Sequence, residues 1–248
     1  MELLQVKDHT PSYINQIKNI RIYMIYNLEG LMNSAIIVAG GLGQRSKSQI
    51  PKQFIKFKNN RIIDFSIKIL ESNKHINEIV IAVCNEWEEI IANENLNCKV
   101  ITGGDSRTES VFRALKQCSD KSKNVIIHDA ARPFITNQFV NNIFTKLLKF
   151  DAVIPVLHNV DSVIEYKNKS LNYLDRDDIK FVQTPQGFNF NILLNAYNQN
   201  NAKLIFPDDM SLLKFYNSEI NFSILDGEKS NFKITSEKDI YRAKELLI

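Results

Sequence analysis

The chain has 248 residues, of which 44% are hydrophobic and 24% charged, an ordinary composition for a single globular α/β domain. Its net charge of +3 gives no reason to expect nucleic acid or a membrane surface as a partner, and no apolar stretch is long enough to span a bilayer. Three widely spaced cysteines match neither a zinc site nor a redox motif. They are typical of reduced thiols, so we expect a cytoplasmic protein.

The first 33 residues differ from the rest of the chain. They carry acidic and amide side chains and lack a continuous apolar segment, which argues against a secretory signal. The first core strand is predicted to begin at about Ser34, shortly after Met24 and Met32. We therefore expect residues 1–33 to be a disordered extension, with native translation starting at one of these methionines, and residues 34–248 to form the functional domain.

From Ser34 onward, short apolar runs alternate with amphipathic segments. Strands are predicted over residues 34–39, 78–83, 99–102, 124–128 and 152–156. Helices are predicted over residues 62–71, 86–92, 107–118, 137–149 and 239–247. Strands separated by helices indicate a Rossmann-like, largely parallel sheet covered by helices on both faces. The alternation breaks at about residues 158–176, a polar excursion typical of a functional loop or of an arm that packs on another subunit.

A glycine-rich turn follows the first predicted strand. It reads Gly40-Gly41-Leu42-Gly43-Gln44-Arg45 and is followed by Pro51-Lys52-Gln53. Glycines allow backbone N–H groups to approach a phosphate closely, and Arg45 and Lys52 supply positive charge beside them. A dinucleotide-binding turn would need a further glycine at Ser46, and no P-loop spacing is present. The run predicts a loop that wraps a triphosphate, although a solvated basic loop is the plainer alternative.

Further motifs follow in chain order: Gly103-Gly104-Asp105-Ser106-Arg107 with Ser110, His128-Asp129-Ala130-Ala131-Arg132-Pro133, Asp175-Arg176, Gln183-Thr184-Pro185-Gln186, Asp208-Asp209, and Asn231-Phe232-Lys233-Ile234-Thr235. Together with the glycine turn, this ordered set resembles the sugar-phosphate nucleotidyltransferases, most closely the 2-C-methyl-D-erythritol 4-phosphate cytidylyltransferase family. The resemblance runs from about Ser34 to the C-terminus. It implies transfer of CMP from CTP to methylerythritol phosphate, with release of pyrophosphate, in non-mevalonate isoprenoid synthesis. It also implies a homodimer joined by a protruding arm, and Mg²⁺ carried on the CTP phosphates rather than by protein ligands.

The resemblance assigns site residues in three groups. CTP would be bound by Ala39, Gly40, Gly41, Gly104, Asp105, Ser110, Asp129 and Ala130. The phosphates would meet the catalytic cations Arg45, Lys52 and Lys233. The acceptor would be held by Asp129, Ser162, Arg176 and Thr184, with Arg176 serving the site of the other subunit.

Taken singly, these residues have plainer readings. The glycines could form an ordinary turn, Asp129 could cap a helix or pair with Arg132, and Lys233 could be a surface residue on an apolar strand.

Three other functions compete with this one. A ribitol-5-phosphate cytidylyltransferase would share the fold, the CTP site and the chemistry, but the motif around Asp129 and the Asp175-Arg176 pair favour methylerythritol phosphate. A non-catalytic nucleotide-binding protein could use the same fold. Retention of Arg45, Lys52 and Lys233 argues against it. A dinucleotide oxidoreductase is disfavoured by the missing glycine.

Overall fold

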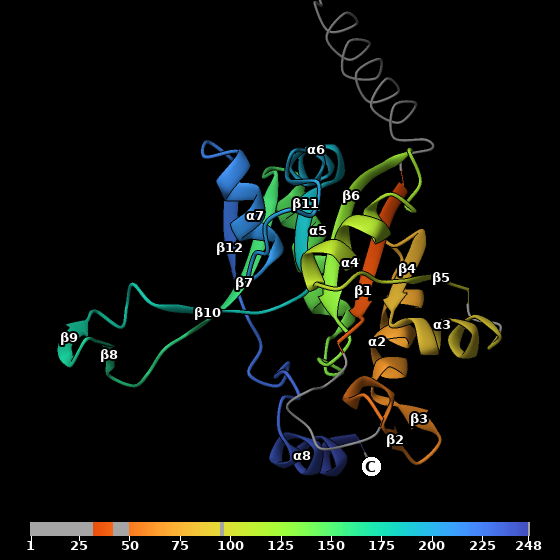
Figure 1. Ribbon diagram of the computed structural model, residues 1–248, viewed down its shortest axis with the longest axis horizontal. Helices are drawn as coiled ribbons and strands as arrows, with labels where there is room; N and C mark the ends of the chain where they lie inside the picture. Colours follow the sequence, from red (N-terminus) through yellow and green to blue (C-terminus); the bar gives the residue numbers. More distant parts are fainter. Residues whose placement is uncertain (1–31, 42–49, 95–96, 248) are drawn as a thin grey trace, which may run out of the picture. The chain divides into compact units, whose positions relative to one another are not determined.

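The computed structural model describes residues 32–41, 50–94 and 97–247. Its centre is an eight-stranded sheet in the order β10-β7-β11-β6-β1-β4-β5, with β12 paired to β7 beside this path (Figure 1). The strands of this sheet are β1 (Met32–Ala39), β4 (Glu78–Val83), β5 (Lys99–Thr102), β6 (Ser122–Asp129), β7 (Ala152–His158), β10 (Lys180–Val182), β11 (Gln186–Asn189) and β12 (Phe222–Asp226). The helices are η1 (Lys52–Phe54), α2 (Ile62–Glu71), α3 (Asn85–Ala92), α4 (Arg107–Leu115), α5 (Asn137–Leu147), α6 (Phe190–Asn200), α7 (Asp209–Tyr216) and α8 (Glu237–Leu247). A small hairpin of β2 (Lys56–Phe57) and β3 (Asn60–Arg61) precedes α2.

The central strands are parallel. β1 lies between β4 and β6, so that Ile36 stands opposite Val80 on one side and Ile127 on the other. β5 continues the parallel order beyond β4, whereas β11 is inserted antiparallel between β6 and β7. The predicted fold class, a largely parallel sheet with helices on both faces, is confirmed.

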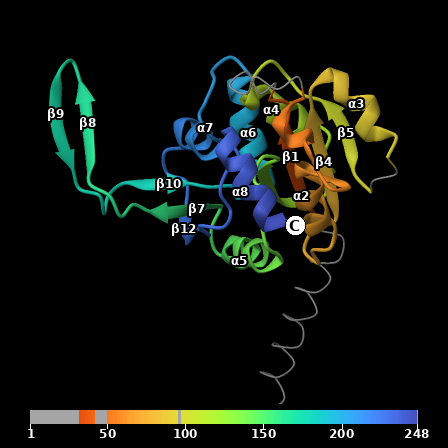
Figure 2. The same cartoon turned by 90° about the horizontal axis from the view of Figure 1, so that it is seen from below.

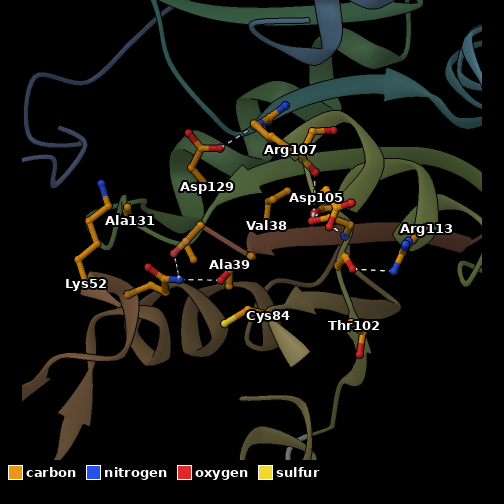
Figure 3. A pocket seen from close by; sticks show the side chains of 18 of the residues that line it. Val38, Ala39, Lys52, Cys84, Thr102, Asp105, Arg107, Arg113, Asp129 and Ala131 are labelled. Atoms are coloured by element: carbon orange, nitrogen blue, oxygen red, sulfur yellow. Dashed lines mark hydrogen bonds and ion pairs between the residues drawn. The ribbon is translucent and has the colours of Figure 1, made fainter. Parts of the chain in front are cut away.

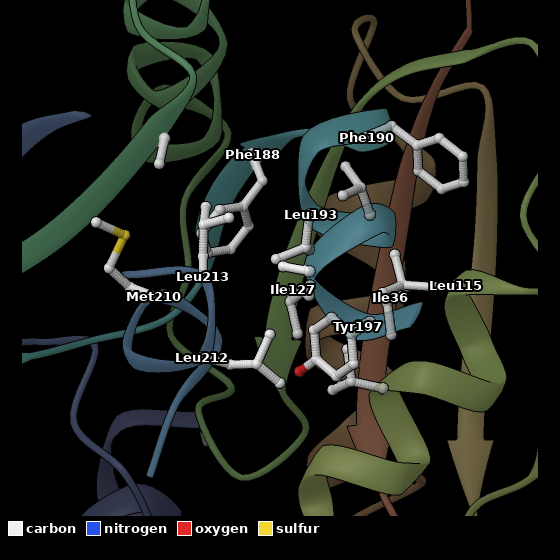
Figure 4. Close-up of a cluster of buried hydrophobic side chains, with 14 of the residues drawn as sticks. Ile36, Leu115, Ile127, Phe188, Phe190, Leu193, Tyr197, Met210, Leu212 and Leu213 are labelled. Atoms are coloured by element: carbon white, nitrogen blue, oxygen red, sulfur yellow. The ribbon is translucent and has the colours of Figure 1, made fainter. Parts of the chain in front are cut away.

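Each face of the sheet packs against its own layer of helices, because successive side chains of a strand point to opposite sides. On one face Ile36 joins a buried cluster with Phe188 of β11 and with residues of α4, α6 and α7, including Tyr197 of α6 (Figure 4). On the other face Ala35 and Ile37 join residues of α2, α3 and α5. None of the helices in the described part of the chain combines the length and the apolar composition needed to cross a bilayer.

Hydrogen bonds explain where two elements begin. β1 begins at Met32 rather than Ser34, because the backbone N–H of Asn33 donates to the side chain of Asn77 (2.8 Å) and both early residues pair with β6. Met32 and Asn33 therefore belong to the sheet and not to the predicted extension, whose residues 1–31 lie outside the described part. Helix α8 starts after Ser236, whose hydroxyl and N–H exchange hydrogen bonds with Asp239.

The polar excursion forms a hairpin. β8 (Val163–Lys167) and β9 (Ser170–Leu174) pair with each other in a separate two-stranded sheet. The hairpin extends away from the main sheet, between the end of β7 and the start of β10 (Figure 2). It leaves Tyr166 and Tyr173 largely exposed. The predicted role of this arm in joining two subunits stays a prediction.

Candidate functional site

A cavity of about 1030 Å³ opens at the carboxyl ends of β1, β4, β5 and β6 (Figure 3). Its lining includes Ala39 at the end of β1, Cys84 just after β4, Thr102 at the end of β5 and Asp129 at the end of β6. In open α/β sheets ligands bind at this edge of the strands. In Figure 3, Lys52 and Asp129 lie on one side of the cavity, and Thr102 and Arg113 lie on the other.

The glycine turn is fastened by a buried glutamine. Gln53 is only 3% exposed, and its side-chain amide donates to the carbonyl of Ala39 (2.6 Å) and to that of Gly41 (2.9 Å). The next residue, Phe54, stacks on Trp87 of α3 with ring centroids 4.0 Å apart. The two hydrogen bonds from Gln53 therefore hold the described part of the turn in place without a ligand. Arg45 lies outside the described residues.

A second turn, at residues 103–105, is organised by the first two turns of α4. The N–H of Gly104 donates to the hydroxyl of Ser110 (3.0 Å), and the N–H of Asp105 donates to the carboxylate of Glu109 (2.9 Å). A Cβ on Gly104 would stand 2.3 Å from Glu109, so only glycine fits there.

Arg113 completes this arrangement. One guanidinium nitrogen donates to the carbonyl of Gly103 (2.7 Å) and another to the Glu109 carboxylate (2.6 Å). The pKa of Glu109 is lowered by the Asp105 N–H and by Arg113. The turn is thus held by a charged carboxylate and its partner, both supplied by α4.

Asp129 is the charged centre of the cavity. Lys233 donates to one of its carboxylate oxygens (2.6 Å) and Arg107 to the other (3.1 Å). Burial raises the pKa of Asp129, but Arg107 and Lys233 more than offset this, so the pKa lies well below its usual range. The ion pair with Arg132 that the sequence suggested is not formed, because the Arg132 guanidinium donates instead to the carbonyl of Asn231 (2.9 Å).

Arg107 joins Asp129 to a second buried carboxylate. Its Nη2 donates to Asp209 (2.7 Å), which also accepts from the hydroxyl of Tyr197 (2.7 Å). Burial lowers the pKa of Arg107, but the neighbouring Asp209 and Asp129 raise it above its ordinary value. The guanidinium therefore stays charged between the two carboxylates.

Behind Asp129 lies a buried polar pair, His128 and Thr184. The hydroxyl of Thr184 accepts from the N–H of Asp129 (3.0 Å) and lies 3.3 Å from Nδ1 of His128. Nε2 of His128 lies 3.0 Å from the carbonyl of Arg132. Burial lowers the pKa of His128 to about 4, so this histidine is neutral at pH 7. Thr184 is buried and bonds the backbone of Asp129, and it does not line the cavity.

The cavity brings together every predicted CTP-binding residue, and also Lys52 and Lys233. They are Ala39, Gly40, Gly41, Lys52, Gly104, Asp105, Ser110, Asp129, Ala130 and Lys233. Lys233 stands in a loop between β12 and α8, not on a strand as its apolar neighbours suggested. Two predicted acceptor residues, Ser162 and Arg176, lie on the exposed arm, where Arg176 donates to the carbonyl of Val160 (3.0 Å). They do not line this chain's own cavity.

Several residues of the site received no role from the sequence. They are Gln53, Arg107, Glu109, Arg113 and Asp209. Gln53, Arg107 and Asp209 stand inside the motifs that carry the resemblance, so the motifs marked them without revealing their contacts. Glu109 and Arg113 have the i, i+4 spacing of a helical ion pair, which indicates their contact with each other but not their contact with the turn.

Comparisons with known proteins agree with this geometry. The family model described as "IspD: 2-C-methyl-D-erythritol 4-phosphate cytidylyltransferase" matches residues 33–248. A 2-C-methyl-D-erythritol 4-phosphate cytidylyltransferase of Clostridium botulinum (strain 657 / Type Ba4) is 33% identical over 228 residues, covering 87% of this chain and 97% of that protein. A bifunctional enzyme IspD/IspF of Pelagibacter ubique is 36% identical over 212 residues, covering 84% of this chain and 56% of that protein.

Solved structures show the same likeness. A 4-diphosphocytidyl-2C-methyl-D-erythritol synthase from Anaerococcus prevotii superposes with a TM-score of 0.78 at 27% identity, covering 88% of this chain and 97% of that one. A 2-C-methyl-D-erythritol 4-phosphate cytidylyltransferase from Thermus thermophilus superposes with a TM-score of 0.73 at 26% identity, covering 87% and 98%. With a family match over nearly the whole described chain, the protein belongs to the 2-C-methyl-D-erythritol 4-phosphate cytidylyltransferase (IspD) family.

Proposed function

We propose that the cavity binds CTP and that the chain transfers its CMP moiety to 2-C-methyl-D-erythritol 4-phosphate, in isoprenoid precursor synthesis. The products are 4-diphosphocytidyl-2-C-methyl-D-erythritol and pyrophosphate. The observation that carries the proposal is one cavity with two hydrogen-bonded turns, lined by Lys52 and by the Lys233–Asp129 ion pair, in a chain of this family.

The acceptor brings its own nucleophile. A phosphomonoester has a second pKa of about 6 and is mostly a dianion at pH 7. One of its oxygens attacks the α-phosphorus of CTP, a new P–O bond forms, and the bond to the bridging oxygen of the β-phosphate breaks as pyrophosphate leaves. No general base is required, so the protein contributes by positioning the two anions and by stabilising their charge.

We assign the two ends of the cavity to the two parts of CTP. Backbone groups of Gly104 and Asp105, with Ser110, suit the edge of the cytosine, because their turn is rigid and carries no obstructing Cβ. The ribose would lie near Gly41 and Asp129. The triphosphate would then meet Lys52 and Lys233. Arg45 is assigned to the same phosphates from the family resemblance.

Magnesium is part of the proposal. No group of three or more His, Cys, Asp or Glu side chains within the described ranges is placed to hold a metal ion. Asp129 lines the cavity, but both its carboxylate oxygens already accept hydrogen bonds from cations. An ion would therefore take most of its ligands from nucleotide phosphates and water, as Mg²⁺ commonly does. When bound, it would neutralise charge on the triphosphate.

We propose further that the protein is a cytoplasmic homodimer and that Ser162 and Arg176 on the arm serve the cavity of the second subunit. Both residues are exposed, and the hairpin that follows Ser162 is paired only with itself within the described chain. An arginine suits a phosphate because its planar fork can make two parallel hydrogen bonds. The cysteines at positions 84, 98 and 118 are free thiols, in keeping with a reducing compartment.

The test is pyrophosphate release with CTP and Mg²⁺, comparing methylerythritol phosphate with ribitol 5-phosphate at matched concentrations. We expect a clear preference for methylerythritol phosphate. A preference for ribitol 5-phosphate would change the acceptor and leave the CTP site intact. CTP binding without pyrophosphate release on either acceptor would favour a non-catalytic nucleotide-binding protein.

A further inference from the structure

A chain of four hydrogen bonds runs from the helix layer into the cavity. The hydroxyl of Tyr197 on α6 donates to Asp209 at the start of α7 (2.7 Å), and Asp209 accepts from Arg107 (2.7 Å). Arg107 also donates to Asp129 (3.1 Å), and Asp129 accepts from Lys233 (2.6 Å). Residues of four separate elements and one loop are thereby linked to one cation of the site.

The inner end of this chain does not reach the cavity. Asp209 is 0% exposed and Tyr197 is 1% exposed, and neither lines the cavity. Both carboxylate oxygens of Asp209 are taken, one by Tyr197 and one by Arg107. A buried carboxylate is costly unless it is paired, and Arg107 is the cation that pairs with Asp209, so the two groups hold each other in place.

The outer end divides the charge of Asp129 between two cations. Arg107 takes one oxygen and Lys233 takes the other, and the cluster balances two carboxylates against two cations. If Arg107 were absent, Lys233 would be the remaining ion-pair partner of Asp129 among the described residues, and it would be drawn more strongly to this buried carboxylate. An arginine suits this bridging place because its planar fork reaches two different carboxylates at once, which a lysine ammonium on a flexible stem does not.

We propose that Arg107 is a positioning residue for CTP binding and transfer. It is held by Asp209, which accepts a second hydrogen bond from Tyr197. It fixes the Asp129 carboxylate and shares its charge, so that Lys233 can turn to the nucleotide phosphates. The inference rests on the proposed placement of CTP at Lys233 and Asp129. It adds Tyr197, Asp209 and Arg107 to the residues that determine the affinity and the rate.

The test uses Asp209→Asn, Tyr197→Phe and Arg107→Lys in the full chain. Calorimetric CTP affinity, kcat and the KM of each substrate are measured, with unfolding free energy in parallel. We expect Arg107→Lys and Asp209→Asn to weaken CTP binding and to lower kcat, by roughly tenfold to a hundredfold, the scale of a misplaced reacting group. Tyr197→Phe should cause a smaller fall in the same direction. Tyr197→Phe removes the hydroxyl and keeps the buried ring, so it should fold and can be measured even if the other two variants do not fold.

The matched control is Tyr216→Phe. Tyr216 belongs to α7, and its hydroxyl donates to Asn200 of α6 (3.1 Å), so this variant also removes one tyrosine hydrogen bond between the same two helices. It should leave CTP affinity and kcat at the wild-type values. A fall equal to that of Tyr197→Phe would overturn the proposal, since general loosening of the helix pair would then explain both.

A double-mutant cycle decides whether Asp209 acts through Arg107. In an Arg107→Lys background, Asp209→Asn should cause little further loss of CTP affinity or kcat. If the losses caused by Asp209→Asn and Arg107→Lys were fully additive, the proposal would be wrong. It would also be wrong if Asp209→Asn and Tyr197→Phe lowered the unfolding free energy but left CTP affinity and kcat at the wild-type values. CTP binding is measured without the acceptor. If the wild-type protein were inactive on methylerythritol phosphate, the proposed function would be contradicted, but the CTP affinities of the variants would still test this chain of hydrogen bonds.

Discussion

Gln53 offers the sharpest test of how the glycine turn is built. Its amide donates two hydrogen bonds, to the carbonyls of Ala39 and Gly41, and replacing it by leucine removes both while nearly keeping the volume. A hydrogen bond contributes about 1 kcal/mol net, so the total loss is about 2 kcal/mol. This loss is divided between folding and nucleotide binding, according to how far the turn loosens before CTP arrives.

We expect Gln53→Leu to lower the unfolding free energy by about 1 kcal/mol and to raise the KM for CTP several-fold, since 1.4 kcal/mol corresponds to a factor of about ten. Urea denaturation and steady-state kinetics measure the two shares. Gln138→Leu is the matched control, because Gln138 donates one hydrogen bond, to Asn142, at an exposed position on α5. If Gln53→Leu changed neither quantity beyond this control, the turn would not depend on Gln53.

Five further changes test other residues. Lys52→Ala and Lys233→Ala should each lower kcat by roughly a hundredfold or more with little loss of stability, and wild-type turnover in either would remove the assignment of that cation. Arg176→Ala should raise the KM of the acceptor and leave that of CTP unchanged, so an unaltered acceptor KM would exclude its role. Glu109→Gln should raise the KM for CTP several-fold at an unchanged kcat, because it weakens the hydrogen bonds from the Asp105 N–H and from Arg113 that hold the 103–105 turn. An equal effect on kcat would show that Glu109 does not act through CTP binding alone. The pKa of His128 is lowered to about 4 in the fold, so the unfolded chain binds a proton that the folded chain excludes. Stability supplied by neutral His128 should fall by about 3 kcal/mol as the pH drops from 6.5 to 4, and His128→Gln should flatten that part of the stability profile measured by urea denaturation.

The elements that the sequence predicted are those whose signal is local. The run Glu78–Val83 is apolar, β-branched and short, and helix Ile62–Glu71 has a regular apolar face, so β4 and α2 agree with the predicted ranges. The strands β10, β11 and β12 are short, and each finds its place only by pairing with β6 or β7 far away in the chain. No periodicity within three to five residues indicates such a partner, and so these strands were not predicted.

The same division applies to the site. Motif residues such as Gly104 and Lys233 could be assigned from their resemblance to a family, and the cavity gathers them. Their contacts could not be predicted, because Arg107 meets Asp209 across 102 residues of sequence and Lys233 meets Asp129 across 104. The sequence suggested Arg132 as the partner of Asp129 because it is near in the chain, and the fold places Arg107 and Lys233 there instead.

These pairings explain how a carboxylate can stand where two phosphate-bearing substrates must meet. An unpaired Asp129 would repel both the triphosphate and the dianionic acceptor, and in a partly buried cavity that repulsion would be screened less than in water. Arg107 and Lys233 each take one of its oxygens, and Arg107 also pairs with Asp209, so the four side chains form a neutral cluster with the half-exposed ammonium of Lys233 at its edge. In the proposed binding mode, Lys233 would move from the carboxylate to a phosphate of CTP, while Arg107 would remain bonded to Asp129. If Lys233 were the sole counter-ion of Asp129, its move to a phosphate would leave the buried carboxylate without a cation at the moment CTP binds.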